Sequence, residues 1–222
     1  MKTKNGDFIE IEYTARIKES NLVFDTTDEK IAKENHLHGK DASYKPVIIC
    51  LGNKELIKGL DDFLVDKEDN NEYEIDIKAK DAFGEKDPKL LQLVNTSKFL
   101  KQNVKPYPGL QINIDNIFGT VKTVSGGRTL VDFNHPLAGK DVIYKVKINK
   151  IVVDANEKIK SHLSKMLGGE VDFKYENSKL TIELNVPNEM QKVISDELKN
   201  AISEIKEVEF KKKEIQKEQN GN

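Results

Sequence analysis

The stretch VDFNHPLAGKDVIYKVKIN (residues 131–149) joins a polar corner to a long alternating segment. Asp132, Asn134, His135 and Pro136 lie close together in the corner, and residues of these kinds favour tight turns. Beyond it, apolar side chains recur at every second position, which predicts a half-buried strand. They are Val142, Tyr144, Val146 and Ile148. Three hypotheses are open for the histidine of the corner: a catalytic group, a metal ligand or a residue that shapes the loop.

The composition excludes several classes of protein. Of the 222 residues, 33% are charged and 37% hydrophobic. No run approaches the roughly 20 apolar residues of a membrane span, and the start MKTKNGDF lacks the apolar core of a secretory signal. We therefore expect a cytoplasmic protein with no membrane partner. The net charge of −2, the presence of only Arg16 and Arg128 as arginines, and the lack of a glycine-rich phosphate loop argue against nucleic-acid binding and nucleotide chemistry.

Period-two alternation predicts further antiparallel strands, and this pattern indicates an α+β fold. The expected strands are 8–17, 21–25, 46–52, 71–81 and 140–154. Residues 26–44 are polar and predict an irregular loop. A helix is predicted over 53–66, with Asn53 as its N-cap and Gly59 as a weak point inside it.

Two other regions do not follow the pattern of these long strands. Residues 87–130 predict a small β-rich module between two strands of the larger domain, and residues after Asp154 predict the order helix, strand, strand, helix, strand. Asn188 is the expected N-cap of the last helix. Its expected buried stripe is Met190, Val193, Ile194, Leu198, Ala201, Ile202 and Ile205.

A search for reactive groups finds little. There is no G-x-S-x-G motif and no local Cys–His pair, and Cys50 in an apolar run predicts a buried structural thiol. His36 and His38 could chelate a metal as a pair, but no third ligand is nearby in the sequence, so a loop role is favoured. His162 is expected to be solvated on a polar helix. The Lys211–Lys213 run is expected to form an exposed edge of a terminal strand rather than a basic contact patch.

Four short motifs occur in a fixed order, and they carry a resemblance. They are VFD (23–25), LIKGLDDFL (56–64), DAFG (81–84) and VDFNHPLAGKDVIYKV (131–146). The chain resembles the FKBP-type peptidyl-prolyl cis-trans isomerases, specifically the SlyD-like branch with an insert in the flap. The resemblance covers about residues 5–153, and the remainder is similar in layout to the C-terminal extension of archaeal long-type members.

This resemblance implies an FKBP-like antiparallel half-barrel sheet around one helix. It implies an isomerase domain in two parts, residues 1–86 and 131–153, separated by an insert-in-flap chaperone domain, residues 87–130. Residues 154–222 would form the C-terminal α-β-β-α-β domain. The sequence does not choose between a homodimer through that domain and a second surface for client chains.

The resemblance also implies the site. It assigns catalytic roles to Tyr13, Asp25, Phe83 and Tyr144, and substrate binding to Phe24, Val47, Leu56, Ile57, Leu60, His135 and Leu137. For Asp25 we favour orienting a tyrosine hydroxyl, that of Tyr13, over meeting charge on the rotating carbonyl. Phe83 stands where the family usually has a tyrosine. The tail KKKEIQKEQNGN lacks the His and Cys residues of metal-binding relatives, so neither a metal nor a cofactor is implied.

The expected function is therefore an enzyme, a peptidyl-prolyl isomerase, whose partners are unfolded or partly folded polypeptides with X-Pro bonds. Apolar residues of the insert would give it holdase activity: Leu91, Leu93, Phe99, Leu100, Ile112, Ile114 and Phe118. The missing hydroxyl at Phe83 keeps an alternative open, a non-catalytic chaperone or adaptor that binds proline peptides. A third reading, a metallochaperone, is disfavoured by the histidine-poor tail.

Overall fold

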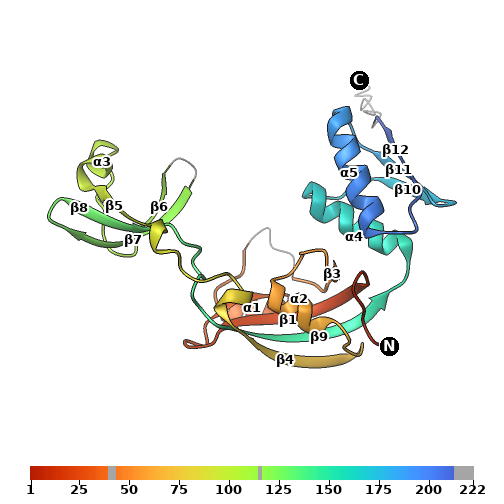
Figure 1. The fold of residues 1–222 in the computed structure, drawn as a ribbon, viewed down its shortest axis with the longest axis horizontal. Helices are drawn as coiled ribbons and strands as arrows, with labels where there is room; N and C mark the ends of the chain where they lie inside the picture. The colour runs from red at the N-terminus through yellow and green to blue at the C-terminus, as the bar shows by residue number, and fades with distance from the viewer. Residues whose placement is uncertain (40–43, 115–116, 213–222) are drawn as a thin grey trace, which may run out of the picture. The chain divides into compact units, whose positions relative to one another are not determined.

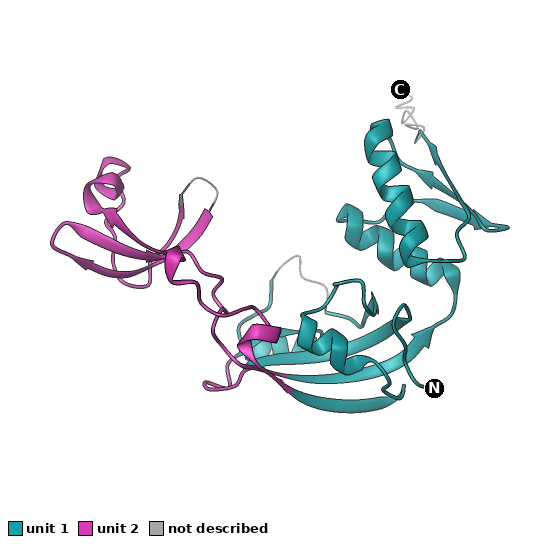
Figure 2. Cartoon of the chain, viewed as in Figure 1, with its two compact units in different colours: residues 1–16, 23–75, 144–222 teal, residues 17–22, 76–143 magenta. Residues whose placement is uncertain are grey.

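The computed structural model describes residues 1–39, 44–114 and 117–212 (Figure 1). The chain divides into two compact units, one of residues 1–16, 23–75 and 144–222 and the other of residues 17–22 and 76–143 (Figure 2). Each unit combines helices with antiparallel strand pairs, which confirms the expected mixed class. Within the described ranges, no helix is both long and apolar enough to cross a membrane.

The main sheet of the first unit has five strands. They are β1 (Phe8–Ile17), β2 (Val23–Thr26), β3 (Val47–Cys50), β4 (Asn71–Ile77) and β9 (Val142–Val152). Their order is β2-β1-β9-β4, and β3 also pairs with β1. Alternate side chains are fully buried, among them Ile9 and Ile11 on β1 and Val146 and Ile148 on β9, as period-two alternation requires. A strand from late in the chain thus completes a sheet that begins at residue 8.

Helix α1 (Glu29–Glu34) lies in the stretch predicted as an irregular loop, so that prediction is wrong. Asp28 caps the helix, since its carboxylate accepts hydrogen bonds from the backbone N–H groups of Lys30 at 2.7 Å and Ile31 at 3.0 Å. Ala32 is its one buried residue. With so little apolar surface, the helix has no hydrophobic period for the sequence to reveal.

Helix α2 (Lys58–Leu64) begins later than the prediction, with Ile57 rather than Asn53 at the N-cap position. Lys54 has a φ of 58°, in the left-handed region, which a helix cannot contain. The Glu55 side chain forms an ion pair with Lys165 of the C-terminal segment. The first predicted turn of the helix is therefore a turn of irregular backbone.

The second unit carries its own four-stranded sheet, in the order β5-β8-β7-β6. Its elements are the short 3₁₀ helices η1 (Ala79–Asp81) and η2 (Pro88–Leu90), β5 (Leu91–Asn95), α3 (Thr96–Lys101), β6 (Gln111–Ile114), β7 (Ile117–Ser125) and β8 (Arg128–Asp132). Phe99, Val121 and Val131 form its small core. Gly119 is required there, because a Cβ at this position would lie 2.7 Å from the ring of Phe133.

The C-terminal segment of the first unit has a three-stranded sheet and two helices. Its elements are α4 (Ala155–Leu167), β10 (Phe173–Glu176), β11 (Lys179–Glu183), α5 (Asn188–Ala201) and β12 (Glu207–Lys211). The sheet order is β10-β11-β12, which puts Lys211 on an edge strand. Of the predicted Lys211–Lys213 run, Lys213 lies outside the described residues.

Helix α5 departs from its prediction in two ways. The N-cap position is Pro187, and Asn188 is the first helical residue. The buried stripe is also narrower than predicted, because Met190 and Val193 are 51% and 62% exposed. Residues on the i, i+4 line of the helix, such as Ile194 and Leu198, are the buried ones.

The C-terminal segment shares its hydrophobic core with the main sheet. Phe8 and Cys50 are buried in the same cluster as Ile159 and Leu163 of α4. Cys50 is thus a buried structural thiol, as predicted. His162 is only 5% exposed, which makes the prediction of a solvated histidine wrong. Its ring packs edge-on against Phe8 at 6.1 Å between centroids.

Glu55 meets this helix from the turn before α2. Its carboxylate forms an ion pair with Lys165, and one carboxylate oxygen lies 3.5 Å from Nδ1 of His162. Burial by itself would raise the pKa of Glu55, but the contacts with His162 and Lys165 outweigh it and lower the pKa to about 2. The charged form of Glu55 therefore stabilises the fold at neutral pH.

We predict that Glu55→Gln lowers the free energy of unfolding by about 1–2 kcal/mol at pH 7, because the carboxylate charge is lost. An unfolded glutamate titrates near pH 4.3, above the folded value of about 2. The wild-type advantage is therefore complete above about pH 5 and fades as the pH falls toward 2. Urea unfolding of both proteins at pH 7 and pH 3 measures it.

The matched control is Glu170→Gln, which removes an exposed carboxylate 3.2 Å from Lys160. This variant should change the free energy of unfolding by less than about 0.5 kcal/mol. A difference between wild type and Glu55→Gln that is the same at pH 7 and pH 3 would contradict the role given to the Glu55 charge.

Candidate functional site

Four of the predicted residues gather on three neighbouring strands of the main sheet. β1 carries Tyr13, β2 carries Phe24 and Asp25, and β9 carries Tyr144. Asp25 pairs with Ala15 in the β1–β2 register, and Tyr13 lies two residues from Ala15 on the same face. This register brings the Tyr13 hydroxyl to Asp25, to which it donates a hydrogen bond of 2.8 Å.

The aromatic rings of this group touch one another. Tyr13 and Tyr144 have centroids 5.8 Å apart, and the ring of Phe24 meets Tyr144 edge-to-face at 6.2 Å. Aromatic side chains packed in this way give a rigid apolar surface with polar hydroxyl tips. The arrangement can hold a small apolar ring beside a carboxylate.

The two tyrosine hydroxyls stay protonated at neutral pH. Burial, followed by the negative charge of Asp25, raises the pKa of Tyr13 far above its ordinary value. Burial and Asp25 also raise the pKa of Tyr144 in the same order. Both groups are therefore permanent hydrogen-bond donors.

A cavity of about 300 Å³ opens at this cluster. Its lining residues are Tyr13, Phe24, Asp25, Thr26, Thr27, Leu37, Tyr44 and Val47. Val47 was predicted as a site residue. Leu37, Tyr44 and the two threonines were missed, because the sequence around α1 offered no pattern that would place them near β1.

The predicted residues around α2 occupy a different place. Leu60 is fully buried on the helix, and Leu56 and Ile57 are half-buried in the turn that leads into it. These three side chains are not part of the lining of the 300 Å³ cavity.

Three predicted residues belong to the second unit. Phe83 and His135 stack face to face, with ring centroids 4.9 Å apart and planes inclined by 4°. The backbone N–H of Leu137 donates to Nδ1 of His135 at 3.2 Å. His135 thus has a ring partner and a backbone partner, which support the shaping of a loop among the three hypotheses for it.

The corner before His135 is built by Asp132 and Asn134. The Asn134 side-chain amide and backbone N–H both donate to Oδ1 of Asp132, at 2.8 and 3.0 Å. The Asn134 oxygen accepts from the backbone N–H of Asp87 at 2.8 Å. Burial raises the pKa of Asp132, but the hydrogen bonds from Asn134 and Lys86 outweigh it and the net pKa is lowered.

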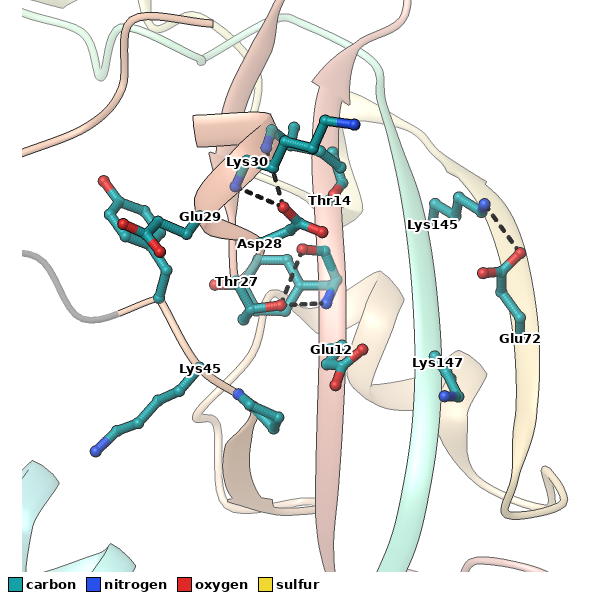
Figure 3. A pocket seen from close by; sticks show the side chains of 14 residues that line it. Glu12, Thr14, Thr27, Asp28, Glu29, Lys30, Lys45, Glu72, Lys145 and Lys147 are labelled. Atoms are coloured by element: carbon teal, nitrogen blue, oxygen red, sulfur yellow. Dashed lines mark hydrogen bonds and ion pairs between the residues drawn. The ribbon is translucent and has the colours of Figure 1, made fainter. Parts of the chain in front are cut away.

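A second, polar cavity of about 550 Å³ shares Tyr13, Thr27 and Tyr44 with the first (Figure 3). Both lysines and acidic residues line it, including Lys145, which pairs with Glu72 at 3.0 Å. It combines polar residues of β1 and β9 with the start of α1. Apart from Tyr13, the residues that line this cavity were given no role by sequence reasoning.

The predicted histidine pair lies outside both cavities. His36 and His38 are exposed, and His38 stacks on Tyr44 with ring centroids 5.5 Å apart. In the part of the chain that the structure describes, no three His, Cys, Asp or Glu side chains gather as a metal site would need.

Two family models of known proteins match parts of the chain. Residues 1–105 match the family model of the FKBP-type peptidyl-prolyl cis-trans isomerases. Residues 92–137 match the model described as FKBP26, IF domain. The strand β9, which completes the main sheet, follows both matched ranges.

Curated relatives agree with these matches. The chain is 28% identical over 148 residues to the short-type peptidyl-prolyl cis-trans isomerase of Methanocaldococcus jannaschii, covering 67% of this chain and 93% of that protein. It is 28% identical over 155 residues to the FKBP-type isomerase SlyD of Treponema pallidum, covering 68% and 79%. It is 25% identical over 111 residues to the FKBP-type 16 kDa isomerase of Escherichia coli, covering 48% and 74%. The chain therefore carries an FKBP-type peptidyl-prolyl cis-trans isomerase domain and an IF domain of the FKBP26 kind.

Proposed function

We propose that the chain accelerates cis–trans rotation of X-Pro bonds in unfolded polypeptides, and that the cavity lined by Tyr13, Phe24 and Asp25 is its proline site. Tyr144 does not line this cavity, but its ring contacts those of Tyr13 and Phe24. The observation that carries this proposal is the 2.8 Å hydrogen bond from Tyr13 to Asp25 within a cluster of aromatic rings. The proposal assigns residues 1–86 and 131–153 to the isomerase domain, residues 87–130 to its insert and residues 154–222 to a C-terminal domain.

Such a site needs no nucleophile. Rotation of an X-Pro bond faces a barrier of about 18–20 kcal/mol because amide resonance is lost in the twisted state. A pocket that binds the twisted imide better than either planar isomer is a catalyst. The aromatic cluster would seat the proline ring and exclude water, which favours the less polar twisted bond. A 10⁶-fold acceleration needs only about 8 kcal/mol of such differential binding.

Asp25 acts in this proposal by orienting the Tyr13 hydroxyl. The carboxylate accepts a hydrogen bond from the phenolic O–H, which fixes the ring as a wall of the pocket and keeps its oxygen at the rim. Tyr144 presents a second protonated hydroxyl from the neighbouring strand. Phe24 and Val47 complete the apolar lining, and the half-buried Leu56 and Ile57 extend the substrate surface. Leu60 is fully buried on α2 and has no exposed surface to offer a substrate.

In this proposal the predicted residues of the second unit contact the substrate without donating a side-chain hydrogen bond from Phe83. Phe83 lacks a hydroxyl and is stacked on His135, so we assign these residues and Leu137 to contacts with the substrate chain. The missing donor favours one competing function, a module that binds proline peptides without turning them over. The assay below separates the two.

We predict that Asp25→Asn lowers kcat/KM for a short X-Pro peptide about tenfold or more, because Tyr13 loses its charged partner. Peptide isomerisation measured on the intact chain tests this. The matched control is Asp76→Asn, an exposed carboxylate paired with Lys18, which should leave kcat/KM unchanged. Equal turnover by Asp25→Asn and wild type would remove Asp25 from the mechanism, and peptide binding without turnover by wild type would favour the binding module.

We further propose that the insert is a holdase. Its apolar surface includes Leu91, Leu93, Leu100 and Phe118, and Phe118 is 74% exposed. Of the other predicted contact residues, Phe99 is buried and Ile112 half-buried, whereas the side chain of Ile114 lies outside those described. β5 and β6 are the edges of its sheet, which suits capture of an unfolded chain by strand addition and apolar contact.

We predict that the double variant Leu93→Ser, Phe118→Ser retains kcat/KM on short peptides but loses the acceleration of a proline-limited refolding reaction. The physical reason is that a short peptide needs only the pocket, whereas a folding chain must also be captured. Val153→Ser, at an exposed apolar residue outside the insert, is the control. If the double variant accelerates refolding as much as the wild type does, this surface is not the chaperone site.

A homodimer through the C-terminal segment stays a prediction. The exposed Met190 and Val193 on α5 are the residues that such an interface would cover. Light scattering on the intact chain should then give twice the mass of one chain, and Val193→Glu should halve it. A single-chain mass for wild type at micromolar concentrations would contradict the dimer.

A further inference from the structure

Helix α4 of the C-terminal segment holds the outer edge of β3. β3 pairs with β1, and the Ile48 carbonyl also accepts a hydrogen bond from the Ser161 hydroxyl at 2.9 Å. The Lys165 ammonium donates to the same carbonyl. Val47, a proposed pocket residue, is the neighbour of Ile48 in this strand and lines the 300 Å³ cavity.

The same helix holds the turn before α2. Lys165 also donates to the Glu55 carboxylate, whose side chain is only 14% exposed. His162 flanks this carboxylate, and both of its ring nitrogens are buried. Leu56 and Ile57 follow Glu55 directly, and Ile57 occupies the N-cap position of α2 without a side-chain cap. The ion pair with α4 therefore anchors a turn that has no cap of its own.

We propose that Lys165, with Ser161 and His162, positions the walls of the proline pocket from the C-terminal segment. Lys165 bridges the two segments that carry Val47 and the Leu56–Ile57 pair, because one ammonium group binds both Ile48 and Glu55. The inference rests on the proposed function, which assigns these three apolar residues to the substrate site.

The expected signature follows from what the positioned residues do. Apolar walls contact the proline ring in the planar and twisted states alike, so displacing them weakens uniform binding. Such a loss raises KM and leaves kcat nearly unchanged. A loss at Asp25, by contrast, should lower kcat. Both losses lower kcat/KM, so kcat and KM measured separately distinguish positioning by α4 from catalysis at β2.

The test compares two lysines of the same helix in the intact chain. Lys165→Met keeps the length of the side chain and removes both bonds, and Lys160→Met removes an exposed pair with Glu170. We expect KM for a short X-Pro peptide to rise about three- to tenfold in Lys165→Met, with kcat kept, and to stay at the wild-type value in Lys160→Met. Circular dichroism and thermal unfolding verify that both variants are folded at the assay temperature.

A second variant tests whether Lys165 acts through its ion pair with Glu55. Glu55→Gln should also raise KM. The double variant Glu55→Gln, Lys165→Met should raise KM by less than the two single effects combined, because both substitutions remove the same ion pair between Lys165 and Glu55. Additive effects, or wild-type KM in both single variants, would overturn the proposal. If the wild-type chain gives no turnover, the proposed isomerase function fails and the dissociation constant of the peptide decides instead. A weaker Kd in Lys165→Met then supports positioning, and an unchanged Kd or no binding to wild type overturns it.

Discussion

The pairing of β9 with both β1 and β4 is the constraint on which the rest of the structure depends. A strand that begins at Val142 takes its place between two strands from the first 77 residues. Closing so long a loop is entropically costly, and the buried alternate residues of β9 offset that cost. The pairing brings Tyr144 to Tyr13. It also requires the chain between β4 and β9 to leave the sheet and return to it, and that stretch forms most of the second unit.

In the mechanism proposed for this sheet, catalysis relies on preorganisation. An X-Pro bond rotates without any bond being broken, so the protein has only to bind the twisted state more tightly than the planar ones. Burial and the charge of Asp25 keep the tyrosine hydroxyls protonated. The strands fix their geometry before the substrate arrives, and no reorganisation is needed during rotation. This explains why a site with no nucleophile and no local Cys–His pair can belong to an enzyme family.

The sequence predicted the strands, which have a repeating pattern, and a contact between residues of two neighbouring strands. Alternation revealed the long strands, and the expected Tyr13–Asp25 contact is present because β1 and β2 are joined by a short connection. It failed where a partner lies far away in the chain. His162 was predicted to be solvated because its helix is polar, yet Phe8 and Glu55 bury it. Helix α1 depends on a cap rather than an apolar face, which periodicity does not detect.

The central claim is that X-Pro bonds rotate in the cavity lined by Tyr13, Phe24 and Asp25. Two-dimensional exchange NMR of a proline peptide, with a trace of the intact chain, measures the rotation rate directly, and an isotope-labelled chain reports where the peptide sits. The account predicts faster cis–trans exchange together with shifted resonances on β1, β2 and β9. Exchange at the uncatalysed rate, or shifts confined to other elements, would contradict it.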